Sequence, residues 1–249
     1  MNSGRIRELP QSNEYPIPPT MKAWVLGGPE QLSLVQKPVP EPGPAEVLVR
    51  VDAIAVCATD IEIIRHGVPA MIDGDLPFNK GFTPGHEYMG TVVKLGRTVD
   101  EFEIGDRVTV EVHAGCGRCQ RCREGMYTSC LNYGYREKGH RANGFSTDGG
   151  FAEYAVNNIN TIAHIPDEMS DAEATLIVTA GTAMYGLDVM GGVIAGEGVV
   201  VIGPGPDRAD GGRGRQGAWG LAGDPDRHPR QPARDGQAAR RRRRGECRP

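Results

Sequence analysis

The chain has 249 residues, of which 39% are hydrophobic, and its formal net charge at pH 7 is −4. No stretch approaches 18 consecutive apolar residues and the first residues contain no apolar signal core, which argues against a membrane span and against export. We therefore expect a cytoplasmic protein in a reducing compartment. Its six cysteines are interpreted as metal ligands or unpaired thiols in preference to disulfides.

Residues 1–20 are polar and proline-rich, and we predict a flexible extension there. Short runs rich in Val and Ile follow, separated by Gly, Pro and Asp. Strands are expected at 21–26, 46–57, 90–96, 105–112 and 151–158. This pattern is typical of a β-barrel or β-sandwich with long loops, and it predicts a mainly β domain over residues 21–165.

The periodicity changes after residue 165. Ser170 and Glu173 have the spacing of a capping box, and the apolar spacing over 170–190 predicts helices that break near Gly181. The run 199–202 then predicts a buried strand of the parallel type, followed by Gly-Pro-Gly. A strand entering a glycine turn opens a dinucleotide-binding βαβ unit. The sequence therefore predicts the start of an α/β domain over residues 166–206.

The nucleotide-binding pattern does not continue beyond Gly205. A helix with a third glycine is expected, but "DRADGGRG" has no apolar period. Its codons, read one base later, allow "IGLMAVVA", which has the apolar spacing of a helix. Those of "RDGQAARRRRRG" allow "AMGKRLGADVVV", which has the pattern of a helix end followed by a strand. We therefore hypothesise a single-base shift near codon 206. A natural or designed basic tail is the alternative.

Residues 207–249 differ from the rest of the chain in charge and composition. They carry 12 Arg, no Lys and 6 acidic residues, a net charge of +6, whereas residues 1–206 have a net charge of −10. They contain no Val, Ile, Phe, Tyr or Met, so burial cannot offset the entropy of ordering their backbone, and we expect disorder. The run Arg240–Arg244 is interpreted as a solvated charge run. A nucleic-acid-binding tail is the alternative, but the acidic body disfavours it, and no nucleic-acid partner is expected.

The strongest motif is a set of four closely spaced cysteines, Cys116-x-x-Cys119-x-x-Cys122-x7-Cys130. Four thiolates within fifteen residues can surround one Zn²⁺ tetrahedrally. Since the protein would fill all four positions, this zinc would be structural. A disulfide knot and four unrelated cysteines are the alternatives.

A second candidate set is dispersed along the chain. Cys57, in "VCATD", and His86, in "GHE", pair a thiolate with an imidazole, which are ligand types of a catalytic zinc. Asp60 can accept the other ring N–H of His86 and fix its tautomer. Thr59 has a hydroxyl that can relay a proton from a zinc-bound alcohol. Taken singly, Cys57 has the plainer interpretation of a small buried hydrophobe and His86 that of a core histidine.

These residues, together with "GHEYMGTVVKLGRTV", "GDRVTVE" and "GGFAEYAV", resemble the zinc-dependent medium-chain alcohol and polyol dehydrogenases, a family that includes sorbitol and threonine dehydrogenases. The resemblance covers Met21 to Gly205. It implies a barrel of GroES-like fold followed by a Rossmann domain, with zinc and NAD or NADP in the cleft between them. It further implies oxidation of a secondary alcohol or polyol, with Gly203 and Gly205 at the cofactor, and a homo-oligomer formed through the cofactor domain.

One departure from the family concerns the third zinc ligand. The family places a Cys or Glu in the stretch that reads "LIVTAGTAMYG" here, and Thr179 stands in its place. Because a neutral threonine is a poor zinc ligand, Cys57 and His86 would need Glu87, water or both, with Glu153 as a less favoured substitute. We expect a zinc-dependent oxidoreductase lineage with an incomplete cofactor site and little activity in the chain as given. A non-catalytic zinc-binding GroES-like module is the alternative, and cofactor binding separates the two.

Overall fold

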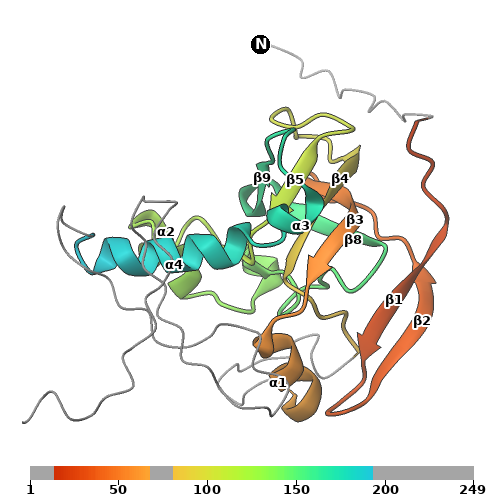
Figure 1. The fold of residues 1–249 in the computed structure, drawn as a ribbon, viewed down its shortest axis with the longest axis horizontal. Helices are drawn as coiled ribbons and strands as arrows, with labels where there is room; N and C mark the ends of the chain where they lie inside the picture. The colour runs from red at the N-terminus through yellow and green to blue at the C-terminus, as the bar shows by residue number, and fades with distance from the viewer. Residues whose placement is uncertain (1–13, 68–80, 193–249) are drawn as a thin grey trace, which may run out of the picture. The chain divides into compact units, whose positions relative to one another are not determined.

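A computed structural model describes residues 14–67 and 81–192 (Figure 1). The strands are β1 (Thr20–Leu26), β2 (Leu32–Pro38), β3 (Glu46–Ala55), β4 (Glu87–Leu95), β5 (Arg107–Val110), β6 (His113–Ala114), β7 (Arg141–Ala142), β8 (Tyr154–Asn158) and β9 (Ile162–His164). The helices are α1 (Ala58–His66), α2 (Gln120–Arg123), α3 (Asp171–Ala174) and α4 (Ile177–Val189), with 3₁₀ turns at Tyr127–Ser129, Arg136–Lys138 and Ile159–Thr161. The predicted strand at 199–202, both cofactor glycines and the segment 207–249 lie outside the described residues.

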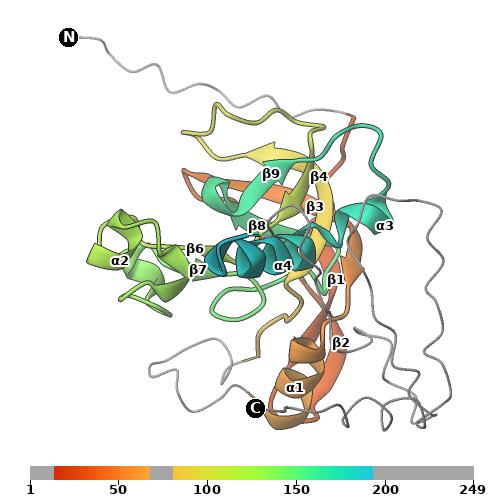
Figure 2. The same ribbon diagram turned by 60° about the vertical axis from the view of Figure 1, so that its left-hand side comes forward.

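The centre of the fold is a five-stranded antiparallel sheet in the order β8-β3-β4-β5-β9 (Figures 1 and 2). Its inward-facing side chains form the largest buried cluster, with Val47, Val49, Tyr88, Val92, Val108 and Val110 all at 0% exposure. Burying apolar area of this kind is the main stabilising contribution to such a domain. The sheet confirms the predicted mainly β class.

A separate two-stranded ribbon of β1 and β2 is attached to the rest by two isolated bridges, Ala23 to Ala152 and Leu26 to Phe82. Strand β2 was not predicted, because it has no fully buried face that would mark it by alternation, and Leu34 is 52% exposed. Strand β1 begins at Thr20, inside the predicted extension. Just before it, the Tyr15 ring lies 5.7 Å from the guanidinium of Arg50.

The predicted helical break near Gly181 is wrong. Helix α4 continues through Gly181, and the interruption falls earlier, between α3 and α4. The capping box of Ser170 and Glu173 forms as predicted and starts α3. A glycine inside a helix costs about 1 kcal/mol relative to alanine, which the helix tolerates. Among the helices in the described part of the chain, none is long and apolar enough to cross a membrane.

Helix α4 buries none of its residues. Met184, Tyr185 and Val189 are each at least 67% exposed, although helices of globular proteins place such side chains against a core. Exposed apolar side chains of this number on one helix mark a candidate contact surface.

Candidate metal centres

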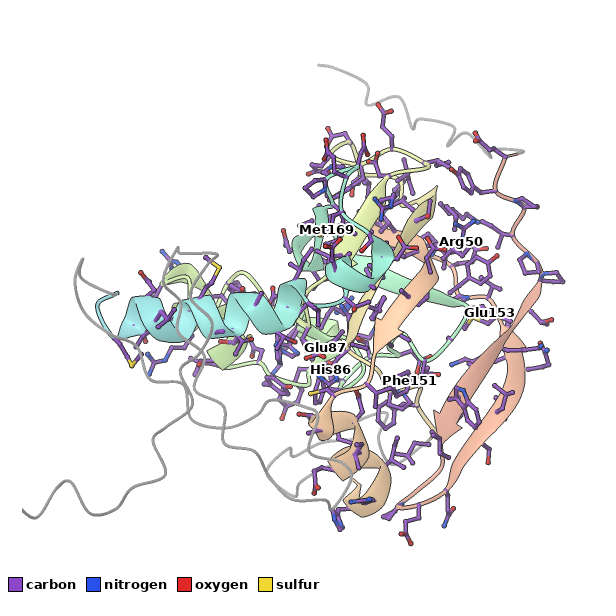
Figure 3. The ribbon with its side chains drawn as sticks, viewed as in Figure 1. Arg50, His86, Glu87, Phe151, Glu153 and Met169 are labelled. Carbon is purple, nitrogen blue, oxygen red and sulfur yellow. The ribbon has the colours of Figure 1, made fainter. Side chains whose placement is uncertain are left out.

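The register between β3 and β4 brings the dispersed candidate residues together. Ala55, the last residue of β3, pairs with Glu87, the first residue of β4. Cys57 and His86 therefore lie next to one another, just beyond the paired ends. One ligand atom from each of Cys57, His86 and Glu87 lies within 4.8 Å of the other two. Figure 3 shows His86 and Glu87 close together near the N-terminal end of α1.

Asp60 lies behind this cluster and holds two of its members. Its Oδ1 atom is 3.0 Å from Nδ1 of His86, and its Oδ2 atom accepts a hydrogen bond from the backbone N–H of Cys57 at 2.9 Å. Asp60 is 0% exposed. A carboxylate at Nδ1 favours the tautomer with the proton on that nitrogen, which leaves Nε2 as the ligand atom. His86 Nε2 lies 3.9 Å from Oε1 of Glu87.

The two threonines also lie at the cluster. Thr59 is exposed, and its Oγ1 atom is 3.6 Å from Cys57 Sγ. Thr179, on α4, donates a hydrogen bond to Oε1 of Glu87 at 3.3 Å. Glu153 is engaged elsewhere, because its carboxylate accepts the backbone N–H of Lys22 at 2.7 Å, and Figure 3 places it apart from the cluster.

The four closely spaced cysteines form a second cluster, with all four Sγ atoms within 4.8 Å of one another. The Cys116–Cys122 and Cys119–Cys130 sulfur pairs are 4.0 and 3.9 Å apart. A tetrahedral site with Zn–S bonds of about 2.3 Å requires sulfur separations of about 3.8 Å. The described cysteines are all unpaired, so the disulfide-knot alternative is not the arrangement found. Donor type and spacing fit a zinc ion.

Within the four-cysteine lobe, residues 116–130, hydrogen bonds favour ionised sulfur at two of the cysteines, because they lower the pKa of Cys116 and Cys119. Burial opposes ionisation of Cys116, but donors from the backbone of Arg118 and Cys119 and from the Asn132 side chain outweigh it and lower the pKa of its thiol. The Asn132 amide donates to Cys116 Sγ at 3.1 Å. Burial raises the pKa of Cys122 and of Cys130. Because the thiolate is the metal ligand, Cys116 and Cys119 are ready donors, while Cys122 and Cys130 must lose their protons when a metal enters.

Sequence reasoning missed a group of rings next to the first cluster. The Phe145 ring packs on His86 with centroids 4.9 Å apart, and its distance to the His113 ring is 6.3 Å. Burial lowers the pKa of His113 and of His140 to about 4, so both are neutral at pH 7. Isolated aromatic and histidine residues carry no ligand spacing. The sequence therefore offered one signal for this group, the position of Phe145 shortly before "GGFAEYAV".

The chain matches the alcohol dehydrogenase GroES-like domain over residues 43–167. It is 39% identical over 173 residues to the L-threonine 3-dehydrogenase of Pyrococcus horikoshii, an alignment that covers 70% of this chain and 46% of that protein. It is 33% identical over 163 residues to the sorbitol dehydrogenase of Bacillus subtilis, covering 66% of this chain and 43% of that protein.

Among solved structures, a putative zinc-binding dehydrogenase from Sinorhizobium meliloti 1021 bound to NADP superposes with a TM-score of 0.59 at 30% identity, covering 68% of this chain and 45% of that one. The chain spans about half the length of the curated relatives it matches.

Proposed function

Since the chain belongs to the zinc-type medium-chain alcohol dehydrogenase family, we propose that its Cys57–His86–Glu87 cluster is a catalytic zinc site for NAD(P)-linked oxidation of a small secondary alcohol or polyol. The observation that carries this proposal is the convergence of three ligand types in front of the buried Asp60. A bound zinc ion supplies Lewis-acid polarisation of the alcohol oxygen.

The neighbouring side chains have defined tasks in this proposal. Asp60 holds the Nδ1 proton of His86 and so keeps Nε2 available as a ligand. Thr59, exposed beside Cys57, carries the hydroxyl proton of the substrate toward solvent. Thr179 does not bind metal in this proposal; its hydroxyl holds Oε1 of Glu87, which becomes the third protein ligand.

The four-cysteine cluster is proposed as a structural zinc site. Cys116, Cys119, Cys122 and Cys130 fill all four tetrahedral positions, so no position is left for a substrate. Its contribution is to fold the lobe, because binding free energy of a structural zinc is folding free energy.

For the cofactor, we propose that residues 21–165 form the catalytic domain and 166–206 begin the nucleotide-binding domain, with Gly203 and Gly205 at the cofactor pyrophosphate. The break in the glycine motif and the helix-compatible codons support an out-of-frame segment at 207–249. The exposed apolar side chains of α4 support a missing covering element.

The metal part of the proposal is tested by metal analysis of the purified chain. Two zinc ions per chain are expected, and Cys57→Ser is expected to lose one of them while the lobe keeps the other. Thr128→Ala, at an exposed position, is the matched control and is expected to keep both. A wild-type content of one zinc that Cys57→Ser leaves unchanged contradicts the catalytic site.

The cofactor part is tested by sequencing the gene around codon 206 and by titrating NADH and NADPH into the present chain and a frame-restored one. The restored chain is expected to bind one of them and to oxidise secondary alcohols, whereas the present chain is not. A restored chain that holds zinc but binds neither nucleotide favours the non-catalytic zinc-binding module.

A further inference from the structure

The loop between β7 and β8 is hydrogen-bonded to the segment that carries His86. Gly149 N–H donates to the carbonyl of Thr83 at 2.7 Å, and Gly150 N–H donates to that of Gly85 at 2.9 Å. The carboxylate of Asp148 accepts the backbone N–H of Thr83 at 2.9 Å. Three hydrogen bonds therefore fix the register of this loop against the residues just before His86.

The two backbones approach so closely that only glycine fits. A Cβ atom on Gly149 would lie 2.0 Å from the carbonyl oxygen of Gly85, and a Cβ atom on Gly144 would lie 2.5 Å from the same oxygen. Gly144 also has a φ of +74°, in the left-handed region that favours glycine. This contact leaves the loop little freedom, and the next residue, Phe145, is placed accordingly.

The Phe145 ring has two imidazole neighbours. Its ring meets His86 at a centroid distance of 4.9 Å and an angle of 50°, and His113 at 6.3 Å and 19°. It also packs against the buried cluster of Leu26, Ile63 and Phe82. Phe145 is thus held by contacts other than the one with His86, as a residue that orients another one must be.

We propose that Phe145 is a positioning residue that, together with Asp60, fixes the imidazole plane of His86 so that Nε2 faces Cys57 and Glu87. This inference rests on the proposed function, since it assigns the orientation of a ligand in the same site. The physical reason is geometric: the Cβ–Cγ bond and the hydrogen bond to Asp60 hold the ring at two adjacent atoms, and a bent hydrogen bond still allows the ring plane to tilt. The Phe145 ring, packed on the imidazole, limits that tilt.

Cobalt(II) is the probe, because its thiolate charge-transfer and ligand-field bands report on the geometry of the donor set. Full-length chain with zinc in the lobe is titrated with Co²⁺ at the first cluster. Phe145→Leu keeps apolar bulk but removes the ring. It is expected to shift the bands and to weaken Co²⁺ binding about tenfold, which is the lower end of the range for partners that orient a metal ligand. Phe145→Tyr, which keeps the ring, is expected to retain the wild-type spectrum.

Phe102→Leu is the matched control. Phe102 also stacks on a histidine, His164, with centroids 4.7 Å apart, and it is buried in the main core. It is therefore expected to lose comparable packing and stability while leaving the cobalt spectrum and affinity unchanged. Equal cobalt affinity and identical bands in wild-type and Phe145→Leu protein would overturn the proposal.

A metal-free readout separates this inference from the proposed function. The imidazole N–H proton of His86, assigned by its absence in His86→Gln, is expected to be observable by NMR in the wild type and broadened by exchange in Phe145→Leu. If the wild type takes up no cobalt outside the lobe, the proposed catalytic site fails. The N–H signal then still decides the positioning role: its persistence in Phe145→Leu contradicts the role, and its loss supports it.

Discussion

Asp60 and His86 form a buried hydrogen bond, with the carboxylate Oδ1 3.0 Å from the ring Nδ1. The two residues are 0% and 5% exposed, so water cannot replace either partner. The second carboxylate oxygen accepts the backbone N–H of Cys57. One side chain therefore connects both candidate ligands at the ends of β3 and β4, and the orientation of the site depends on it.

Asp60→Asn is predicted to weaken zinc binding at the first cluster by 10- to 100-fold, the range for partners that orient a metal ligand. An amide of the same shape must turn its NH₂ group toward either the His86 N–H or the Cys57 N–H, so one donor loses its acceptor. Zinc competition with a chromophoric chelator measures the affinity. Glu62→Gln, on the same helix with a side chain 66% exposed, is the control and is expected to match the wild type. An unchanged affinity in Asp60→Asn contradicts the orienting role.

Thr179→Glu is predicted to raise zinc affinity at the first cluster. Thr179 Oγ1 lies 3.3 Å from Glu87 Oε1, so a carboxylate at this position reaches the cluster and adds a charged oxygen donor. Thr179→Val removes the hydroxyl without adding a donor, and its affinity is expected to stay at or below that of the wild type. If the Glu and Val variants bind zinc alike, residue 179 does not reach the metal site, and it is not the position at which the family carries a Cys or Glu ligand.

Local spacing was sufficient to anticipate the four-cysteine cluster, because fifteen residues folded into one loop bring such sulfurs together. Ligand type alone suggested Cys57 and His86, and the family resemblance added Glu87. Their proximity could not be read from spacing, since only the pairing of β3 with β4 brings residue 57 beside residue 86.

Two features could not be derived from the sequence. Strand β2 has no buried face, so no alternation of apolar residues marks it. The contact of Phe145 with His86 depends on the close approach of Gly149 to Gly85, a tertiary contact between segments 64 residues apart that leaves no local pattern.

Cys119→Ser is predicted to remove zinc from the lobe and to destabilise it. Serine still offers an oxygen to cap α2 in place of the sulfur that now accepts from Cys122 N–H, so the main loss is the metal ligand. The zinc content is expected to fall by about one per chain. The thermal midpoint is expected to fall by roughly 4–8 °C, as for a loss of about 2 kcal/mol in a domain of this size. Full zinc content with an unchanged midpoint would refute the structural site.

The buried imidazole of His140 is predicted to limit the stability of the fold in acid. This residue is 0% exposed, its Nδ1 accepts the backbone N–H of Gly134 at 3.1 Å, and its Nε2 has no hydrogen-bond partner among the described residues. Burial, with the charges of His113 and Arg141, lowers its pKa to about 4. In the unfolded chain the pKa of a histidine is about 6.5. As the pH falls from 6.5 toward 4, the unfolded state gains a proton that the folded state lacks, so the free energy of unfolding decreases.

His140→Asn keeps an acceptor for Gly134 and removes the titrating group. The slope of the unfolding free energy against pH in this window is therefore expected to become shallower by up to one proton, about 1.4 kcal/mol per pH unit. Urea denaturation of zinc-loaded protein at pH 7, 6 and 5 measures the slope. Since acid also protonates the cysteine ligands in every variant, the informative quantity is the difference from wild type. His66→Gln, with a side chain 69% exposed, is expected to keep the wild-type slope. If His140→Asn keeps it too, the buried imidazole does not limit acid stability.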